Sequence, residues 1–325
     1  MSRRKKKIIR YFRRPFEWAG IGLGLVIISN LPRRWMLALC DLLSMAMYRF
    51  DGRGKRLALA NLRVVRGMAG ECEGVVCPVA RYNPSSAEAK IIRRSYRNMA
   101  RAVGHAFWTC RNAIERVHDA GEMSAEGKRF LKENRPAVTV SGHIGCWEIL
   151  SQLAFLEGHQ MMSVAKDVGT GGMTRLLMKS RTSIGQEIVH ANGAFRPLMQ
   201  GLKEGKSLGL LVDQLVKTKD GGVWVKFFGH PIPVSAAPAF FSAKGKAPIV
   251  VAWSRPLKDG RYRCEIVASY RPEEARDIRG MTQHCICCLE RIIRRHPSTW
   301  VLNYRYFRKW PTAEEMEQLE KNAIQ

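Results

Sequence analysis

The chain has 325 residues. Its hydrophobic fraction of 46% is enough to form a folded core. With 54 Lys and Arg against 28 Asp and Glu, the formal net charge of +26 favours acidic partners: nucleic acid, anionic lipid headgroups, phosphorylated glycolipids or an acidic carrier protein. The nine cysteines have no regular spacing, which argues against a disulfide framework and indicates reduced thiols in the cytosol.

The N-terminal region combines a basic stretch with an apolar one. Eight of the first fourteen residues are Lys or Arg and none is acidic, and the apolar run 18–31 follows and ends at Pro32. Fourteen helical residues reach only about 21 Å, whereas a bilayer span needs roughly 20 residues. A second segment, 35–50, has apolar residues at helical spacing. We expect a helical hairpin, or an anchor helix followed by an interfacial helix.

A secretory signal peptide is the alternative interpretation of this N-terminus, because it too has basic residues before a short apolar run. The thiol-rich body of the chain argues against export. Basic residues before an apolar run also keep the N-terminus on the cytoplasmic side of a membrane. The dense positive charge suits an anionic lipid surface, so an anchor is the preferred interpretation.

The rest of the chain is predicted to alternate between helices and strands. Helices are expected at 52–66 and 86–114, and the Gly- and Pro-containing stretch 67–86 between them is expected to be a loop. From about Pro136, short β-branched runs alternate with helical segments, which predicts an α/β sheet with helices packed on its faces. The predicted strands are Ala137–Val140, Met161–Ala165, Glu187–His190, Leu208–Val212, Val223–Phe228, Pro248–Trp253 and Tyr262–Val267.

A cluster of thiols near the C-terminus raises the question of a metal site. His284, Cys285, Cys287 and Cys288 lie within five residues, and Cys264 is the only nearby partner. A structural zinc site normally pairs two such elements, and no second pair is present in the sequence. Free thiols on a helix are the preferred interpretation, and no metal is expected.

The strongest local signal is Val138-Thr-Val-Ser-Gly-His143-Ile-Gly-Cys-Trp-Glu148. A buried strand is predicted to end at Val140, followed by a tight turn and by a helix that begins near Gly145. His143 then lies at the carboxyl end of a strand, where open α/β sheets bind their ligands. The Glu148 carboxylate can accept one ring N–H and fix the tautomer, while the other ring nitrogen takes a proton from a hydroxyl. The alternative is a hydrogen-bonded turn histidine beside a salt-bridging Glu.

These residues resemble a known family. His143-Ile-Gly145-Cys-Trp147-Glu148 resembles the His-x4-Glu box of the bacterial lipid A biosynthesis acyltransferases, relatives of the glycerolipid acyltransferases, whose box is His-x4-Asp. Cys146 departs from the family, since many members have Asn there. Other blocks follow in the family's order: Arg56-x3-Ala60-Asn61-Leu62, Arg181-x3-Gly185, Gly205-x7-Asp213-Gln214, Val223-x-Val225-x-Phe227-Phe228-Gly229-x-Pro231, Ala243-x3-Ala247-Pro248 and Pro297-x2-Trp300-x4-Arg305.

The resemblance implies a fold and a set of roles. The fold would be a central mixed sheet flanked by helices, with membrane-anchoring helices in 1–50 and one catalytic domain in 51–325. His143 would be the general base and Glu148 its orienting partner. Arg181, Asp213 and Arg305 would bind substrate.

Each of those three residues has a physical role and an alternative to it. Arg181 would stabilise an oxyanion or clamp a lipid phosphate, or else be a solvated helix residue. Asp213 is expected at the end of the strand Leu208–Val212, at the same sheet edge as His143. It would hold Arg181 or an acceptor hydroxyl, or else cap a turn. Arg305 is expected to be structural or to bind a headgroup.

The resemblance also implies a reaction and its partners. A fatty acyl group would pass from a thioester on acyl carrier protein to a hydroxyl of a lipid A precursor, at the cytoplasmic face of the cell inner membrane. No metal or bound cofactor is needed, because the phosphopantetheine arm arrives with the donor. Carrier protein, phosphorylated glycolipid and bilayer surface are all acidic, which accounts for the basic charge.

Two alternatives remain open. The acceptor is a different membrane lipid in the first, such as a phosphatidylinositol mannoside, a lysophospholipid or an ornithine lipid. In the second, the chain is a non-catalytic basic protein that binds membranes. A nucleic-acid partner is not expected, because the sequence has no recognised nucleic-acid-binding module.

Overall fold

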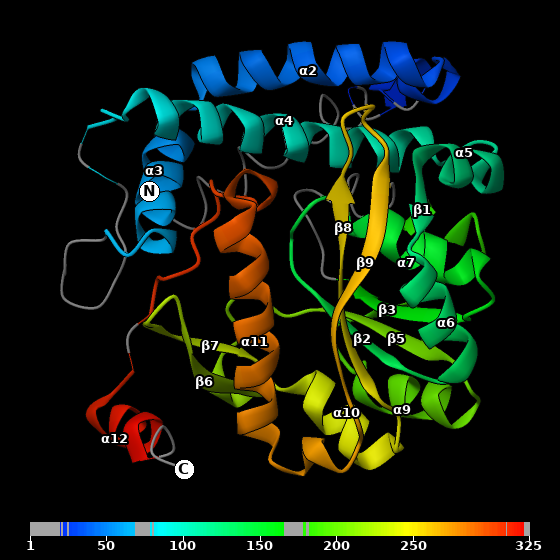
Figure 1. The fold of residues 1–325 in the computed structure, drawn as a ribbon, viewed down its shortest axis with the longest axis vertical. Helices are drawn as coiled ribbons and strands as arrows, with labels where there is room; N and C mark the ends of the chain where they lie inside the picture. Colours follow the sequence, from blue (N-terminus) through cyan, green and yellow to red (C-terminus); the bar gives the residue numbers. More distant parts are fainter. Residues whose placement is uncertain are drawn as a thin grey trace, which may run out of the picture.

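A computed structural model of the chain describes residues 20, 22–24, 26–68, 79, 81–165, 178–179, 182–309 and 311–321, without the side chains of 318, 320 and 321. A mixed β-sheet lies at its centre with helices on both faces (Figure 1). The helices are α2 (Arg33–Phe50), α3 (Gly52–Val65), α4 (Ser86–Trp108), α5 (Ala113–Ala120), α6 (Ala125–Glu133), α7 (Trp147–Leu156), α9 (Phe195–Lys203), α10 (Ala237–Gly245), α11 (Ile278–Arg295) and α12 (Ala313–Lys321).

The central sheet has seven strands in the order β1-β9-β8-β2-β5-β3-β4. Its strands are β1 (Gly121–Met123), β2 (Val138–Ser141), β3 (Met161–Ala165), β4 (Glu187–His190), β5 (Ser207–Leu211), β8 (Ile249–Pro256) and β9 (Tyr262–Tyr270). All neighbouring pairs are parallel except β8 and β9. Since β2 and β5 are parallel neighbours, the segments that follow Ser141 and Leu211 emerge side by side at the same edge of the sheet.

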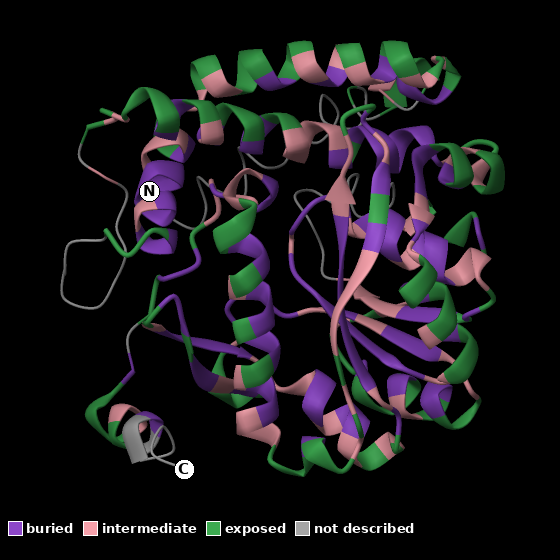
Figure 2. Cartoon of the chain, in the orientation of Figure 1, coloured by how far each residue is buried: buried purple, intermediate pink, exposed green. Residues whose placement is uncertain are grey.

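Two apolar clusters cover the two faces of this sheet. Val138 and Val140 belong to one cluster, which includes residues of α9, α10 and α11. The other cluster joins residues of α6 and α7 to Met161 and Ala252 of the sheet. Successive residues of a strand point to opposite faces, so Thr139 and Ser141 face the α6–α7 side. Figure 2 shows the central strands and the inner sides of the helices as mostly buried, whereas β9 is largely intermediate.

A separate antiparallel hairpin, β6 (Gly222–Phe227) and β7 (His230–Ser235), packs against α11. The two residues between its strands, Phe228 and Gly229, have φ of 52° and 82°. Positive φ at both positions is typical of the tight turns that join hairpin strands. This turn is the Phe-Phe-Gly-x-Pro block of the sequence.

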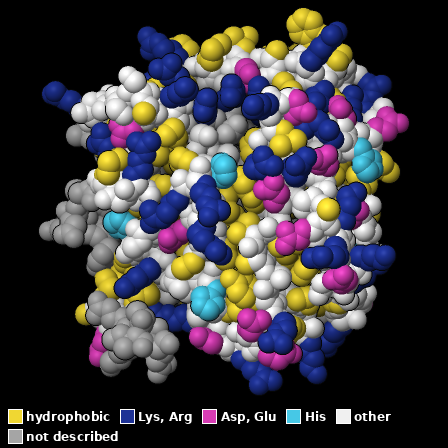
Figure 3. All heavy atoms as spheres, in the orientation of Figure 1, with side chains coloured by type: hydrophobic (Ala, Val, Ile, Leu, Met, Phe, Trp, Pro, Cys, Tyr) yellow, Lys and Arg dark blue, Asp and Glu magenta, His cyan; other side chains and the backbone are white. Residues whose placement is uncertain are grey.

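Helix α2 lies along α4 at one end of the molecule (Figure 1). Its residues Met36, Cys40 and Ser44 are buried, at a spacing of one helical turn. The opposite face carries Trp35, Leu42 and Met45, all exposed. Figure 3 shows hydrophobic and basic side chains together along this edge. Among the described residues, no helix has both the length and the apolar character needed to cross a bilayer.

The fold confirms the predicted α/β class, with a mixed sheet flanked by helices. All seven predicted strands are present, and the helix predicted at 52–66 is α3. The helix predicted at 86–114 is two helices instead, because Asn112 adopts a left-handed conformation between α4 and α5. The apolar run 18–31 lies partly outside the described residues, so the N-terminal anchor and the domain boundary at residue 50 stay predictions.

Candidate active site

The loop after β2 has a shape that depends on two glycines. A Cβ at Gly142 would lie 3.2 Å from Cγ of Asp213, so the backbone there approaches that carboxylate closely. Gly145 has a φ of +66°, and a Cβ on it would collide with the carbonyl oxygen of Ser254. Helix α7 therefore begins at Trp147, two residues later than predicted. The loop is further fixed by hydrogen bonds from Gly145 N to Thr299 O and from Val301 N to His143 O.

His143 forms a pair with Asp213, which follows β5. Nδ1 of the imidazole lies 2.7 Å from Oδ1 of Asp213, and the backbone N–H of His143 donates to Oδ2 at 2.9 Å. The indole N–H of Trp300 donates to the same Oδ2 at 3.0 Å. Asp213 is fully buried, whereas the His143 side chain is 21% exposed. The carboxylate thus fixes the imidazole through Nδ1 and leaves the opposite side of the ring accessible.

The electrostatics keep Asp213 ionised despite its burial. Desolvation alone raises the pKa of the carboxyl group, but the charge of His143 and the hydrogen bonds from His143 and Trp300 outweigh it. The net result is a pKa below the ordinary value of 3.8. A carboxylate that stays charged stabilises the imidazolium form of His143 during proton transfer.

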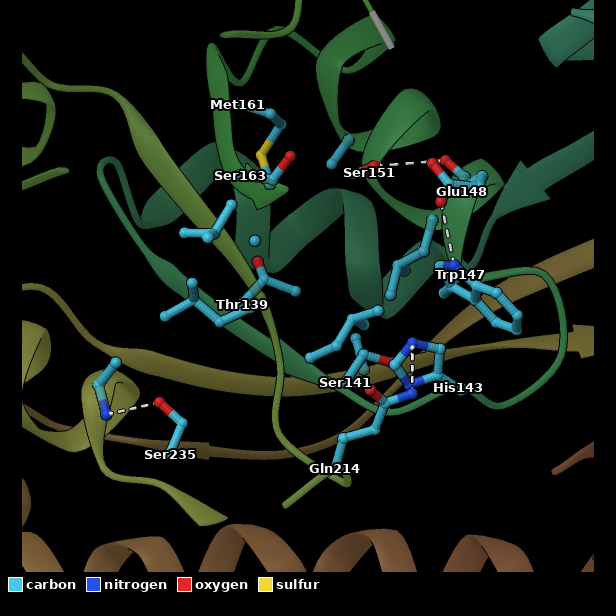
Figure 4. A pocket seen from close by; sticks show the side chains of 18 of the residues that line it. Thr139, Ser141, His143, Trp147, Glu148, Ser151, Met161, Ser163, Gln214 and Ser235 are labelled. Carbon is cyan, nitrogen blue, oxygen red and sulfur yellow. Dashed lines mark hydrogen bonds between the residues drawn. The ribbon is translucent and has the colours of Figure 1, made fainter. Parts of the chain in front are cut away.

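The second ring nitrogen of His143 faces Gln214. Nε2 of Gln214 lies 3.2 Å from Nε2 of His143 (Figure 4). With Nδ1 donating its proton to Asp213, Nε2 presents a lone pair to the Gln214 amide. This is the tautomer that a general base requires. Trp147 contacts the ring from the side, with ring centroids 4.9 Å apart.

Glu148 does not hold the position that the sequence predicted for it. The predicted orienting partner of His143 was Glu148, but the carboxylate at Nδ1 belongs to Asp213. Glu148 is buried and accepts the indole N–H of its neighbour Trp147 at 3.0 Å (Figure 4). It lies in the first turn of α7 and lines the same cavity as His143. The reason is the late start of α7, which carries Glu148 away from the ring.

The predicted substrate-binding residues have three different outcomes. Asp213 is fully buried and its carboxylate accepts hydrogen bonds from His143 and Trp300, which disfavours contact with an acceptor hydroxyl. Its predicted contact with Arg181 stays a prediction. Arg305 is exposed, next to Tyr304, which lines the cavity. Its headgroup role stays a prediction. Arg181 lies outside the described residues.

Among the described cysteines, Cys146 is the one near His143 in the loop, and it is not a reactive thiol. Cys146 is fully buried, and burial raises the pKa of its thiol to about 12. The thiolate that a covalent acyl-cysteine requires is therefore not formed at neutral pH. Cys285 and Cys288 are buried on α11 and Cys287 is exposed. Within the described part of the chain, no three His, Cys, Asp or Glu side chains come close enough to hold a metal ion.

A cavity of about 1020 Å³ opens beside the His143–Asp213 pair. It extends over the face of the sheet that α6 and α7 cover, and its lining reaches α9 and α10. Most of this lining is apolar. The residues closest to the chemistry are His143, Trp147, Glu148, Gln214 and Tyr304, and the deeper lining includes Met123, Phe130, Leu131, Leu150, Ala154 and Met161.

Two residues of the site were not identified from the sequence. Trp300 was seen only as part of the Pro-x2-Trp-x4-Arg block, since nothing in the sequence near it points to a residue 87 positions away. Gln214 had a local signal, because it directly follows Asp213 at the end of a predicted strand. The same alignment of strand ends indicated that Asp213 and His143 share one edge of the sheet, which the register of β2 and β5 confirms.

A family model and a solved structure are similar to this chain. The sequence matches the family model described as bacterial lipid A biosynthesis acyltransferase over residues 2–309. No curated protein matches the chain. Among solved structures, the 1-acyl-sn-glycerophosphate (LPA) acyltransferase PlsC from Thermotoga maritima is similar over 83% of this chain and 99% of its own, with 12% identity and a TM-score of 0.35.

Proposed function

The chain belongs to the bacterial lipid A biosynthesis acyltransferases, and from that premise we propose that it transfers a fatty acyl group from an acyl thioester to a hydroxyl of a lipid A precursor. One observation carries the proposal. The imidazole of His143 is held at Nδ1 by a buried carboxylate and directs Nε2 toward a large, mostly apolar cavity. A base beside an apolar cavity suits the deprotonation of a hydroxyl next to a fatty acyl chain.

The reaction proceeds through His143. Its Nε2 takes the proton of the acceptor hydroxyl as the oxygen attacks the thioester carbonyl. The tetrahedral intermediate then expels the thiolate as the carbon–sulfur bond breaks, and the imidazolium returns the proton to the sulfur. Asp213 stabilises the imidazolium throughout. The acceptor hydroxyl takes the place at Nε2 that the Gln214 amide occupies.

The developing oxyanion needs hydrogen-bond donors. The backbone N–H of Trp147, the first residue of α7, is one proposed donor, because the first N–H groups of a helix have no acceptor within the helix itself. Arg181 is the proposed second donor. A guanidinium at that point would favour the charged intermediate or hold a lipid phosphate.

The proposed acyl donor and cellular location rest on the net charge of the chain and on the exposed apolar face of α2. We propose acyl carrier protein as the donor, because an acidic protein is attracted to a chain of net charge +26. The exposed apolar face of α2 would rest on the anionic cytoplasmic surface of the cell inner membrane, where the glycolipid acceptor lies. The cavity would hold the acyl chain.

An acyl-transfer assay tests this function. Purified protein receives dodecanoyl acyl carrier protein and either a lipid A precursor, a phosphatidylinositol mannoside, a lysophospholipid or an ornithine lipid. We expect acylated lipid A precursor as the main product, and a loss of about 10²–10⁴-fold in His143→Ala. Full activity of His143→Ala would refute the mechanism, and preference for another lipid would replace the acceptor. Absence of transfer to all four would favour a non-catalytic membrane protein.

A further inference from the structure

The apolar cavity contains a polar strip on its floor, formed by three neighbouring strands. Thr139 of β2 pairs in register with Gly209 of β5, and Gly209 pairs with Ser163 of β3. All three residues therefore lie on the same face of the sheet, and all three line the cavity. Figure 4 shows Thr139 and Ser163 on the same wall. Gly209 has no side chain, and the methyl group of Met161 partly fills the space beside it.

Neither hydroxyl of this strip has a protein partner. Thr139 is 8% exposed, its accessible surface faces the cavity, and none of the hydrogen bonds among the described residues involves its side chain. Oγ of Ser163 is buried and likewise has no partner within the described part of the chain. Buried polar groups in folded proteins are nearly always hydrogen-bonded. These two hydroxyls, and Oγ of Ser141 on the same face, which also has no partner among the described residues, therefore call for a ligand or water that pairs with them.

The surroundings of the strip are apolar. Met161 lies next to it on β3, and its methyl carbon would be 3.4 Å from a Cβ placed on Gly209. Val250 of β8 pairs with Thr139 on the other side and also lines the cavity. An unsubstituted hydrocarbon chain in this space packs against the apolar walls but leaves both hydroxyls without a hydrogen bond. A chain that carries one hydroxyl at this depth pairs with Thr139, whereas Ser163 lies two strands away, roughly 10 Å across the sheet, beyond the reach of the same hydroxyl.

Resting on the acyl transfer proposed above, we propose that Thr139 recognises a hydroxyl group within the acyl chain of the donor, and that Ser163 extends the polar floor beside it. The preferred donor is then a hydroxylated fatty acyl thioester. Thr139 lies two residues before Ser141 on the strand, about 7 Å further from the catalytic loop. The recognised hydroxyl therefore lies well along the chain and not beside the thioester carbonyl.

The test compares donors that differ only in the hydroxyl. Dodecanoyl thioesters of acyl carrier protein are prepared without a hydroxyl and with a single hydroxyl at successive positions along the chain. For the wild-type protein we expect kcat/KM for one mid-chain isomer to exceed that of the plain chain by about tenfold, since a site built to hydrogen-bond a hydroxyl discriminates against its absence. Equal values for all donors would overturn the proposal.

The variants assign the preference to the strip. Thr139→Val has nearly the same shape without the hydroxyl, and it should bring the ratio of hydroxylated to plain donor to about one, whereas Ser163→Ala should change this ratio less. Thr282→Val is the matched control, because Thr282 is buried on α11 and bonds within its own helix. A preference that survives Thr139→Val would overturn the proposal. Loss of transfer from every donor to every acceptor in wild type would instead remove the acyltransferase function itself.

Discussion

At the scale of single residues, the site depends on which carboxylate touches His143. Asp213 accepts hydrogen bonds from both the backbone N–H and Nδ1 of His143, whereas Glu148 accepts one from Trp147. We expect Asp213→Asn to lower kcat by about 10²–10⁴-fold, because the amide favours the wrong tautomer and cannot stabilise the imidazolium. Glu148→Gln should cost at least tenfold less. Steady-state kinetics decides the matter, and the reverse order would return Glu148 to the role of orienting partner.

Trp300 is a positioning residue for Asp213. Its indole N–H donates to Oδ2 at 3.0 Å, and its ring stacks on Tyr306 with centroids 4.1 Å apart. Trp300→Phe removes this donor, so the pKa of Asp213 should rise toward its ordinary value. We expect kcat to fall about tenfold while KM changes less than twofold. A fall in apparent kcat that matches the loss of folded protein, with kcat per folded molecule unchanged, would indicate a purely structural role.

The same substitution makes a prediction about pH. The pKa of Asp213 is lowered in the folded state, so its charge contributes stability above the ordinary value of 3.8, and this contribution is lost as pH falls through the folded pKa. The difference in free energy of unfolding between wild type and Trp300→Phe should therefore shrink as pH is lowered below about 4. A difference that is independent of pH would mean that only packing is lost. Urea unfolding at several pH values measures it.

His105 on α4 gives a second dependence on pH. It is fully buried, and desolvation lowers its pKa from 6.5 to about 4. The unfolded chain therefore takes up a proton between these values that the folded chain does not, and stability falls as pH falls from 6.5 to 4. The expected loss is roughly 3 kcal/mol. In His105→Phe, which keeps a ring against Trp108 and Tyr262, this part of the pH dependence should vanish.

Part of the active site could be predicted from residue types and their spacing in the sequence. His143 was identified because a strand end and flanking glycines mark it, and the placement of Asp213 on the same edge followed from the strand pattern. Glu148 was assigned wrongly because its offset of five residues from His143 brings it to the ring only if α7 starts early. That start depends on Gly145 fitting against Ser254, a contact across the sheet that no local pattern reveals.

At the scale of elements, α2 and α4 are joined through a close approach. A Cβ on Gly104 would collide with Sγ of Cys40, and Arg101 holds Asp41 through two hydrogen bonds of 2.7 Å. We expect Gly104→Ala to destabilise the protein by about 1–3 kcal/mol through overpacking. The double variant Gly104→Ala/Cys40→Ala should recover most of this loss, because the sulfur that clashes is gone. Additive losses in a double-mutant cycle would contradict the contact.

The elements were predicted where their own residues specify them. The seven predicted strands are rich in β-branched and apolar residues. They form although strands that are neighbours in the sheet are often not consecutive in the sequence. Strand β7 was missed because Pro231 and Pro233 disfavour a strand, and it forms because β6 supplies its partner. Strand β1 has three residues and exists only through its pairing with β9. Elements of this kind are set by tertiary contacts.

At the scale of the whole molecule, α2 presents its apolar face outward. Leu42 and Met45 are 59% and 63% exposed, and basic residues flank them on the same helix. We expect binding to vesicles that contain anionic lipid, weakened at least tenfold in Leu42→Ser/Met45→Ser. Ile114→Ser, which changes an equally exposed apolar residue on α5, is the control. Unchanged binding of the double variant in a flotation assay would leave α2 without a role at the membrane.

The distance along the chain between the parts of the site has a consequence for biosynthesis. His143, Asp213 and Trp300 come from the middle, the second half and the last tenth of the chain, and the carboxylate gains its third donor only when the segment near Trp300 docks. A nascent chain still on the ribosome, or a chain cleaved by a protease after α11, therefore contains His143 and Asp213 but lacks the hydrogen bond from Trp300. The catalytic pair therefore reaches its final geometry only after the last part of the chain has folded onto the sheet.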